Sequence, residues 1–308
     1  MRDNKVLEFV KRINWHWLKW RLAAFLIIIG VILIAVALWK RPNVFNLDRS
    51  DSLVQLEQKT KIYHYDPYKE QKILIPDFSV ARNTYDVNQF SQNEQGFITY
   101  PNAKTGIDVS SHQQQIDWKK VKQSGIDFAI IRVGLRGSTE GGIFIDDFFH
   151  ENMQGAIAND IKVGAYFFSQ AISTKEAIEE AEFVLEEVKD YTLSYPIVFD
   201  WENVIHSEDA EPPRSNAVTP EEVSAFAAAF CETIKNAGEI PAYYVNKELG
   251  YNGLDLEMLE PYDLWYAEYQ PKPSFYYHFD IWQYTENGKV PGISTDVDIN
   301  LSFKEYKE

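Results

Sequence analysis

From residue 105 onward the chain alternates short apolar runs with capped helical segments, and this alternation constrains its fold more than any other feature. Apolar runs of about four to eight residues between turn residues are typical of buried strands. One helix should begin at Asp117 and end at Gly125, and two more should begin with capping boxes at Ser173 and Thr219. We expect eight strands, at residues 106–109, 128–133, 163–168, 195–199, 241–245, 264–267, 281–284 and 297–299.

Eight strands with helices between the earlier ones predict an α/β fold, namely a (β/α)8-like barrel over residues 105–308. The later connections look too short for full helices, so we expect the second half of the barrel to be irregular. On this architecture functional groups lie at the carboxyl ends of the strands.

Two acids, Asp200 and Glu202, flank Trp201 directly after the apolar run 195–199. In an extended strand such residues point the same way, with Cα atoms roughly 6.5 to 7 Å apart. Like charges raise one another's proton affinity, so the pair can hold one protonated and one ionised carboxyl group, as a glycosidase requires. Asp108 and Asp298 fall on the first and last strands, which are neighbours in a closed barrel. We therefore expect all four acids at one mouth.

The N-terminal part predicts a membrane anchor. Residues 22–39 form an uncharged run of 18 residues, at the lower edge of what spans a bilayer. Six Lys or Arg lie in residues 1–21, which should therefore remain in the cytoplasm and place the rest of the chain outside. Cleavage of a signal peptide is the alternative, since residues 35–37 (AVA) have the small residues of a cleavage site. Residues 40–104 are polar without sustained periodicity and predict a stalk or a segment wrapped around the barrel.

Charge and composition exclude several classes of function. The formal net charge of −16 comprises +6 in residues 1–41 and −22 in residues 42–308, which argues against a nucleic-acid partner. The single Cys231 cannot form an internal disulfide and reads as a small apolar residue of a helix core. The six histidines lack metal-ligand spacing, so we expect neither a metal nor a cofactor.

Arg132, inside an apolar strand, should pair with acids of the barrel.

The chain resembles glycoside hydrolase family 25, the lysozyme-type muramidases, over residues 105 to about 303. Any one of the matching stretches would be weak, but seven in family order make the resemblance strong. They are residues 106–110 (GIDVS), 129–134 (AIIRVG), 164–168 (GAYFF), 200–202 (DWE), 264–267 (LWYA), 282–285 (WQYT) and 297–300 (VDIN).

The resemblance implies cleavage of the β-1,4 bond between N-acetylmuramic acid and N-acetylglucosamine in peptidoglycan. Carried over by position, Glu202 is the general acid, and Asp200 is an ionised group that stabilises positive charge or orients the acetamido group of the substrate. Asp108 and Asp298 are supporting carboxylates. Water attack and substrate-assisted retention both remain open. The candidates for lining the sugar groove are Tyr166, Tyr244, Trp265, Trp282 and Gln283, with ordinary barrel packing an equal alternative for Trp282.

Two other functions are compatible with parts of this pattern. A chitinase-like endo-N-acetylglucosaminidase also has an Asp-x-Glu pair after a strand, but usually has further acids two and five residues earlier, where this chain has Val198 and Tyr195. A catalytically silent, membrane-tethered glycan-binding or scaffold protein would keep the barrel without needing its acids. Protein partners are not indicated by the sequence.

Overall fold

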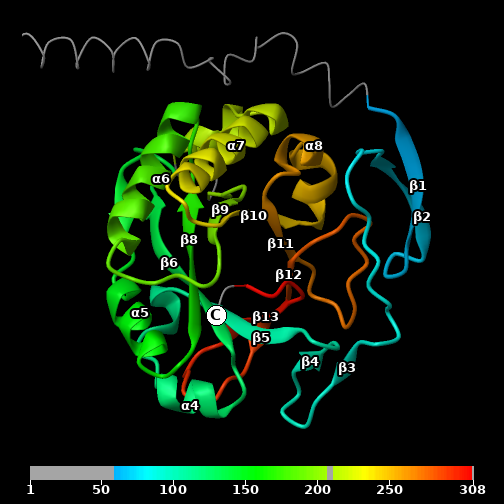
Figure 1. Ribbon diagram of the computed structural model, residues 1–308. Helices are drawn as coiled ribbons and strands as arrows, with labels where there is room; N and C mark the ends of the chain where they lie inside the picture. Colours follow the sequence, from blue (N-terminus) through cyan, green and yellow to red (C-terminus); the bar gives the residue numbers. More distant parts are fainter. Residues whose placement is uncertain (1–58, 207–210, 307–308) are drawn as a thin grey trace, which may run out of the picture. The chain divides into compact units, whose positions relative to one another are not determined.

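A computed structural model describes residues 59–206 and 211–306, and a closed barrel of eight strands lies at its centre (Figure 1). Each of the eight predicted strands is present, most of them longer than predicted. The fourth is displaced rather than extended, because it begins two residues later than predicted and continues through Asp200 to Trp201. The barrel strands are β5 (Lys104–Val109), β6 (Phe128–Arg136), β8 (Lys162–Ser169), β9 (Ile197–Trp201), β10 (Pro241–Asn246), β11 (Asp263–Ala267), β12 (Ile281–Gly288) and β13 (Val297–Ser302).

The last strand runs against its neighbours. The strands from β5 to β12 pair in parallel around the barrel, whereas β13 pairs antiparallel with both β12 and β5 and so closes it. Because β13 is reversed, its first residues lie at the mouth where the other strands end. A further short strand, β7 (Ile143–Ile145), pairs antiparallel with the end of β6. The barrel is therefore mixed rather than a regular (β/α)8 barrel.

The helices cover the first half of the barrel, with α5 and α6 against β6 and β8 and α7 against β9 and β10 (Figure 1). Among the described residues no helix connects β11 to β12 or β12 to β13, in agreement with the short connections in the sequence. The helices are α4 (Trp118–Gln123), α5 (Phe149–Ile157), α6 (Thr174–Val188), α7 (Pro220–Asn236) and α8 (Leu256–Leu259), the 3-10 turns η1 (Ser111–Gln113) and η2 (Arg214–Ala217), and the π-helical turn η3 (Leu249–Gly253).

The predicted helix starts are mostly correct. Asp117 caps α4, and Thr219 and Glu222 form a complete capping box on α7. Ser173 caps α6 by accepting a hydrogen bond from the Glu176 backbone, but the Glu176 carboxylate does not return to Ser173. It accepts instead from the backbone N–H of Ile172 and pairs with Arg214, so the capping box predicted here is only half formed.

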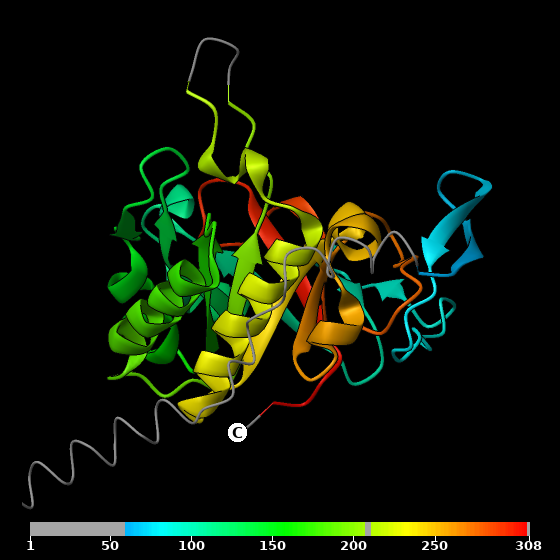
Figure 2. The same ribbon diagram turned by 90° about the horizontal axis from the view of Figure 1, so that it is seen from above.

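Residues 59–104 wrap around the second half of the barrel, where they contact η3 and α8, and they belong to the same compact unit as the barrel. Figure 2 shows this segment, coloured blue to cyan, on the opposite side from α5 and α6. It contains two hairpins, β1 (Lys61–Asp66) with β2 (Gln71–Pro76) and β3 (Ser91–Gln92) with β4 (Ile98–Thr99). Backbone hydrogen bonds from Asn83 to Tyr276 and from His278 to Ala81, each 2.9 Å long, fasten it to the β11–β12 connection. The segment thus covers a connection that no helix protects.

Close packing fills the barrel below its mouth. The Phe128 ring occupies the space beside Gly106, where a Cβ atom would come within 2.3 Å of it, and stacks on Tyr195 at 4.1 Å between ring centroids. Above this pair, buried side chains from alternate positions of the strands continue the core, including Ile130, Val198 and Ile281. Only residues further along each strand can therefore face an opening.

No helix of residues 59–206 and 211–306 combines the length and the apolar character that a membrane span needs. The predicted span 22–39 lies outside the described residues, as does the rest of the N-terminal segment up to residue 58.

Candidate active site

The four predicted acids come together at the mouth of the barrel. Asp108 is the fifth residue of β5, Asp298 is the second residue of β13, and Asp200 and Glu202 lie at the end of β9. The charge of Asp108 raises the pKa of each of the other three acids, so the carboxyl groups are near neighbours. Their convergence follows from barrel closure, which makes β5 and β13 adjacent and brings β9 to the same end.

Asp108 and Asp298 form a pair across the closing strands. They are directly opposite in the antiparallel register of β5 and β13, where facing side chains lie about 5 Å apart at Cβ. Burial and the charge of Asp108 raise the pKa of Asp298 to about 9. Asp298 is therefore protonated at neutral pH and its carboxyl group donates a hydrogen bond to Asp108. Asp108 also accepts from Asn300 Nδ2 at 2.8 Å and from Gln283 Nε2 at 2.9 Å.

Asp200 is a buried carboxyl group whose pKa lies well above its ordinary range. Burial is the main cause, followed by the charges of Glu202 and Asp108, and the opposing charge of Arg132 does not cancel their effect. Its Oδ1 atom is buried without a hydrogen-bond partner among the described residues. From the sequence we expected an ionised Asp200, whereas its surroundings shift its pKa in the direction of the protonated form.

Glu202 follows the end of β9 and faces an open cleft of about 490 Å³. Burial, and then the charge of Asp108, raise the pKa of its carboxyl group. Its backbone carbonyl accepts a 2.8 Å hydrogen bond from Gln170 Nε2, and Gln170 Oε1 in turn accepts from Ser215 at 2.9 Å. Gln170 is buried and holds the strand end that carries both Asp200 and Glu202. Sequence reasoning missed this residue, since a glutamine after a strand gives no signal of its own.

Arg132 lies at the mouth on β6, but its main partner is not one of the four acids. Its Nε and Nη2 atoms both bond Asp146 at 2.8 Å, and Nη2 also donates to Ser111. The prediction that Arg132 pairs with a barrel acid was therefore wrong as to the partner. Its charge still lowers the pKa of Asp200. Asp146 follows the short strand β7, which the sequence did not predict.

The predicted groove residues divide into four groups, of which Trp282 alone forms the last. Tyr244 lines the cleft together with Glu202. Tyr166 and Trp265 are buried beneath the acids, in edge-to-face contact at 6.0 Å, and Trp265 donates to Asn300. Gln283 is buried and donates a hydrogen bond to Asp108.

Trp282 does not line the cleft at all. It is completely buried, its Nε1 donates to the Glu268 carbonyl, and Phe90 packs edge-on against it at 5.4 Å. Successive residues of a strand point to opposite faces, so Gln283 faces the barrel interior and Trp282 faces the wrapping segment.

An aromatic residue that we did not predict, Tyr269, takes the exposed position at the cleft. Its side chain is 45% exposed, it lines the cleft, and its hydroxyl donates to Gln283 Oε1 at 3.0 Å. It is thereby linked through Gln283 to Asp108. Tyr269 lies in a loop after β11 with no periodic pattern around it, so the sequence did not distinguish it from other loop aromatics. Across the residues that the structure describes, no group of three or more His, Cys, Asp or Glu is arranged to hold a metal ion.

Comparison with known proteins places this site in a family. Residues 107–293 match Glycosyl hydrolases family 25, a range that includes Asp108, Asp200 and Glu202 and ends five residues before Asp298. YegX of Escherichia coli (strain K12) is 27% identical over 292 residues, which are 91% of this chain and 90% of YegX. Lysozyme M1 of Streptomyces globisporus is 26% identical over 239 residues, which are 67% of this chain and 74% of that lysozyme.

A solved structure shares the fold. The modular autolysin LytC of Streptococcus pneumoniae, in complex with a synthetic peptidoglycan ligand, superposes with a TM-score of 0.55 at 24% sequence identity. The similarity covers 79% of this chain but only 56% of LytC. Because the family match extends over more than half of the sequence and contains three of the four acids at the barrel mouth, this chain belongs to the glycosyl hydrolases of family 25 and is a glycoside hydrolase.

Proposed function

We propose that this glycoside hydrolase is a muramidase, which cleaves the β-1,4 bond between N-acetylmuramic acid and N-acetylglucosamine in peptidoglycan. The observation that carries the proposal is the convergence of Asp108, Asp200, Glu202 and Asp298 at the mouth of the barrel, beside an open cleft. Family membership supports it, as do the similarity to Lysozyme M1 and the peptidoglycan ligand bound to LytC. Family membership also argues against the chitinase-like alternative.

Glu202 is the proposed proton donor. Of the four acids it is the one that lines the cleft, where the oxygen of a glycosidic bond can reach it. A general acid must keep its proton near the working pH, and both burial and Asp108 act in that direction on Glu202. Gln170 fixes the backbone from which this side chain projects.

We propose that Asp200 becomes ionised as positive charge develops on the substrate. Burial and the neighbouring acids raise its pKa, and its Oδ1 atom has no hydrogen-bond partner among the described residues. Positive charge developing on the sugar lowers the pKa of an adjacent carboxyl group, so the ionised form becomes favoured as the reaction proceeds. The free oxygen is also suited to hydrogen bonding with an acetamido group. Asp108 and Asp298 support the pair, Asp108 by its charge and Asp298 by its hydrogen bond to Asp108.

We also propose that residues 22–39 anchor the enzyme in a membrane, with residues 1–21 in the cytoplasm and the catalytic domain outside. The support is the uncharged run of 18 residues and the six Lys or Arg before it. Peptidoglycan lies outside the cytoplasmic membrane, so this orientation would bring the barrel to its substrate.

Replacing Glu202 with Gln should lower kcat by about 10³ or more, because an amide of the same shape cannot protonate the leaving oxygen. The measurement is the release of new reducing ends from peptidoglycan, with mass spectrometry of the borohydride-reduced products. Wild-type products should end in reduced muramic acid. Glu186→Gln, an exposed position on α6, is the matched control and should retain activity. Ends in reduced glucosamine would contradict the muramidase assignment, and binding without cleavage by the wild type would favour the scaffold alternative.

Replacing Asp200 with Asn should lower kcat by about 10² or more, the scale seen when stabilisation of a developing charge is lost. Asparagine has the shape of a protonated aspartate but cannot become negative during the reaction. The loss should appear in kcat rather than in KM, as steady-state rates on solubilised glycan would reveal. Near-normal kcat in this variant would rule out the proposed role.

Replacing Asp108 with Asn should move the alkaline limb of the pH profile of kcat/KM to lower pH. The negative charge of Asp108 raises the pKa of Glu202, so removing that charge lowers the pKa at which Glu202 loses its catalytic proton. The shift is measured relative to the wild type at constant ionic strength. An alkaline limb at the same or higher pH would mean that Asp108 does not set the protonation of Glu202.

Full-length protein should sediment with membranes, and protease added to intact spheroplasts should digest the barrel domain. A chain lacking residues 1–41 and produced in the cytoplasm should stay in the soluble fraction, because it has neither the apolar run nor the flanking charges. Recovery of the full-length protein in the soluble fraction would contradict the anchor, whereas a shortened N-terminus in the mature protein would indicate signal-peptide cleavage.

A further inference from the structure

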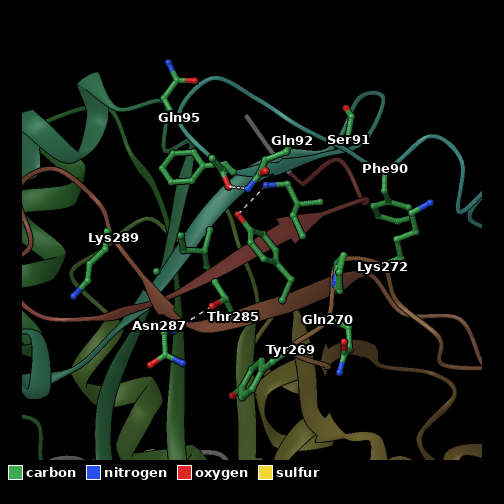
Figure 3. Close-up of a pocket in the computed structure, with 17 residues that line it drawn as sticks. Phe90, Ser91, Gln92, Gln95, Tyr269, Gln270, Lys272, Thr285, Asn287 and Lys289 are labelled. Atoms are coloured by element: carbon green, nitrogen blue, oxygen red, sulfur yellow. Dashed lines mark hydrogen bonds between the residues drawn. The ribbon is translucent and has the colours of Figure 1, made fainter. Parts of the chain in front are cut away.

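A second pocket, of about 810 Å³, lies beside the catalytic cleft, and Tyr269 lines both. Its size is within the range of about 300–1,000 Å³ that is usual for specific ligand sites. Figure 3 shows Gln92 and Gln95 on one side of the pocket and Tyr269 and Gln270 on the other. A substrate bound in the cleft therefore has this pocket within reach.

One wall of the pocket is formed by residues that lie outside the range matched by the family. Residues 90–98, including the β3–β4 hairpin, precede the matched range 107–293. This wall is fastened to the barrel, because Phe90 packs on Trp282 and the Ile98 backbone N–H donates to the Tyr284 hydroxyl at 3.3 Å. The pocket is thus a fixed addition to the family domain, made by the wrapping segment of this chain.

The charge of the pocket is opposite to that of the cleft. Its lining contains two lysines, Lys272 and Lys289, and no Asp or Glu, although the chain carries a net charge of −16. Lys289 is exposed and pairs with Asp296. Lys272 is half-buried and makes no ion pair with any residue of 59–206 or 211–306. Figure 3 shows the two lysines at opposite ends of the pocket.

The wrapping segment also fixes the backbone of Lys272. The Tyr68 hydroxyl donates to the Lys272 carbonyl at 2.7 Å and accepts from its N–H at 3.2 Å. Four side-chain amides, which both donate and accept hydrogen bonds, share the lining with this ammonium group. They are Gln92, Gln95, Gln270 and Asn287.

We propose that this pocket binds the peptide attached to the muramic acid of the substrate, with Lys272 taking one of the peptide carboxylates. The inference rests on the proposed function. The amidated glycan backbone of peptidoglycan is neutral, so it gains little from an unpaired ammonium group, whereas the peptides carry free carboxylates and a series of amide groups. A charge-assisted hydrogen bond to Lys272 and amide pairing along the walls would select strands that carry peptides.

The test compares three substrates with the full-length chain in mild detergent. They are peptide-bearing glycan strands, the same strands stripped of peptide by an amidase with the lactyl carboxylates thus exposed converted to methylamides, and peptide-bearing strands whose carboxylates have been converted to methylamides. We expect kcat/KM to be about tenfold higher on the first than on the other two, the scale of one charge-assisted hydrogen bond. Added salt should reduce the preference, because a half-exposed ion pair is screened.

Lys272→Met should remove most of this preference, chiefly by raising KM for the peptide-bearing strands. Lys119→Met is the matched control, since Lys119 is exposed on α4 and outside the pocket. Thermal unfolding of both variants verifies that the fold is retained. Equal kcat/KM on all three substrates, or a Lys272→Met variant that keeps the preference, would overturn the pocket proposal and leave the muramidase proposal intact. Failure of the wild type on every substrate would instead overturn the proposed function.

A binding measurement separates peptide from sugar as the occupant. Calorimetry on the Glu202→Gln protein, which should not cleave, is done with a free stem tripeptide and with an N-acetylglucosamine trimer. Adding Lys272→Met should abolish binding of the tripeptide. If it weakens binding of the trimer and leaves the tripeptide unaffected, the pocket is a sugar site and the proposal is wrong.

Discussion

The protonation of the site depends on four carboxyl groups that share the enclosed mouth of the barrel. Like charges in such a space cannot all be ionised, and burial raises the pKa of Asp108, Asp200, Glu202 and Asp298 alike. The charge of Asp108 raises the pKa of the other three further. The positive charge of Arg132, which is paired with Asp146, lowers the pKa of Asp200 without cancelling the rise. The surroundings of the cluster therefore favour protonated carboxyl groups, and this is the condition that a general acid needs.

Two departures from a regular barrel make this arrangement possible. The reversed strand β13 presents Asp298 opposite Asp108 at the mouth, whereas a parallel strand would place its second residue at the other end of the barrel. The missing helix after β11 leaves a long connection, and the segment 59–104 covers it. That segment buries Trp282 on the outer face of the barrel and holds the loop that carries Tyr269 and Lys272.

The strands and the acids could be predicted because each leaves a local signal. Apolar runs, capping residues and the Asp-Trp-Glu sequence are all short-range patterns, and closure of the barrel then implies convergence of Asp108 and Asp298. Side-chain environment could not be predicted in the same way. The burial of Trp282 and the raised pKa of Asp200 depend on segments far away in the sequence, and the pairing of Arg132 with Asp146 depends on the unpredicted strand β7. Tyr269 and Gln170 lie just after strands, where no periodicity distinguishes a functional residue from a structural one.

The opposite charges of the two neighbouring pockets have a consequence for how a polymer can lie on the enzyme. A glycan backbone without charge can pass over the acid cluster at little electrostatic cost, but a peptide carboxylate placed there would be repelled and would raise the pKa of Glu202 further. Lys272 offers that carboxylate a favourable position on the far side of Tyr269. Repulsion at the cleft and attraction at the pocket thus favour the same orientation of a peptide-bearing strand. The repulsion follows from closure of the barrel, and the attraction follows from where the wrapping segment meets it.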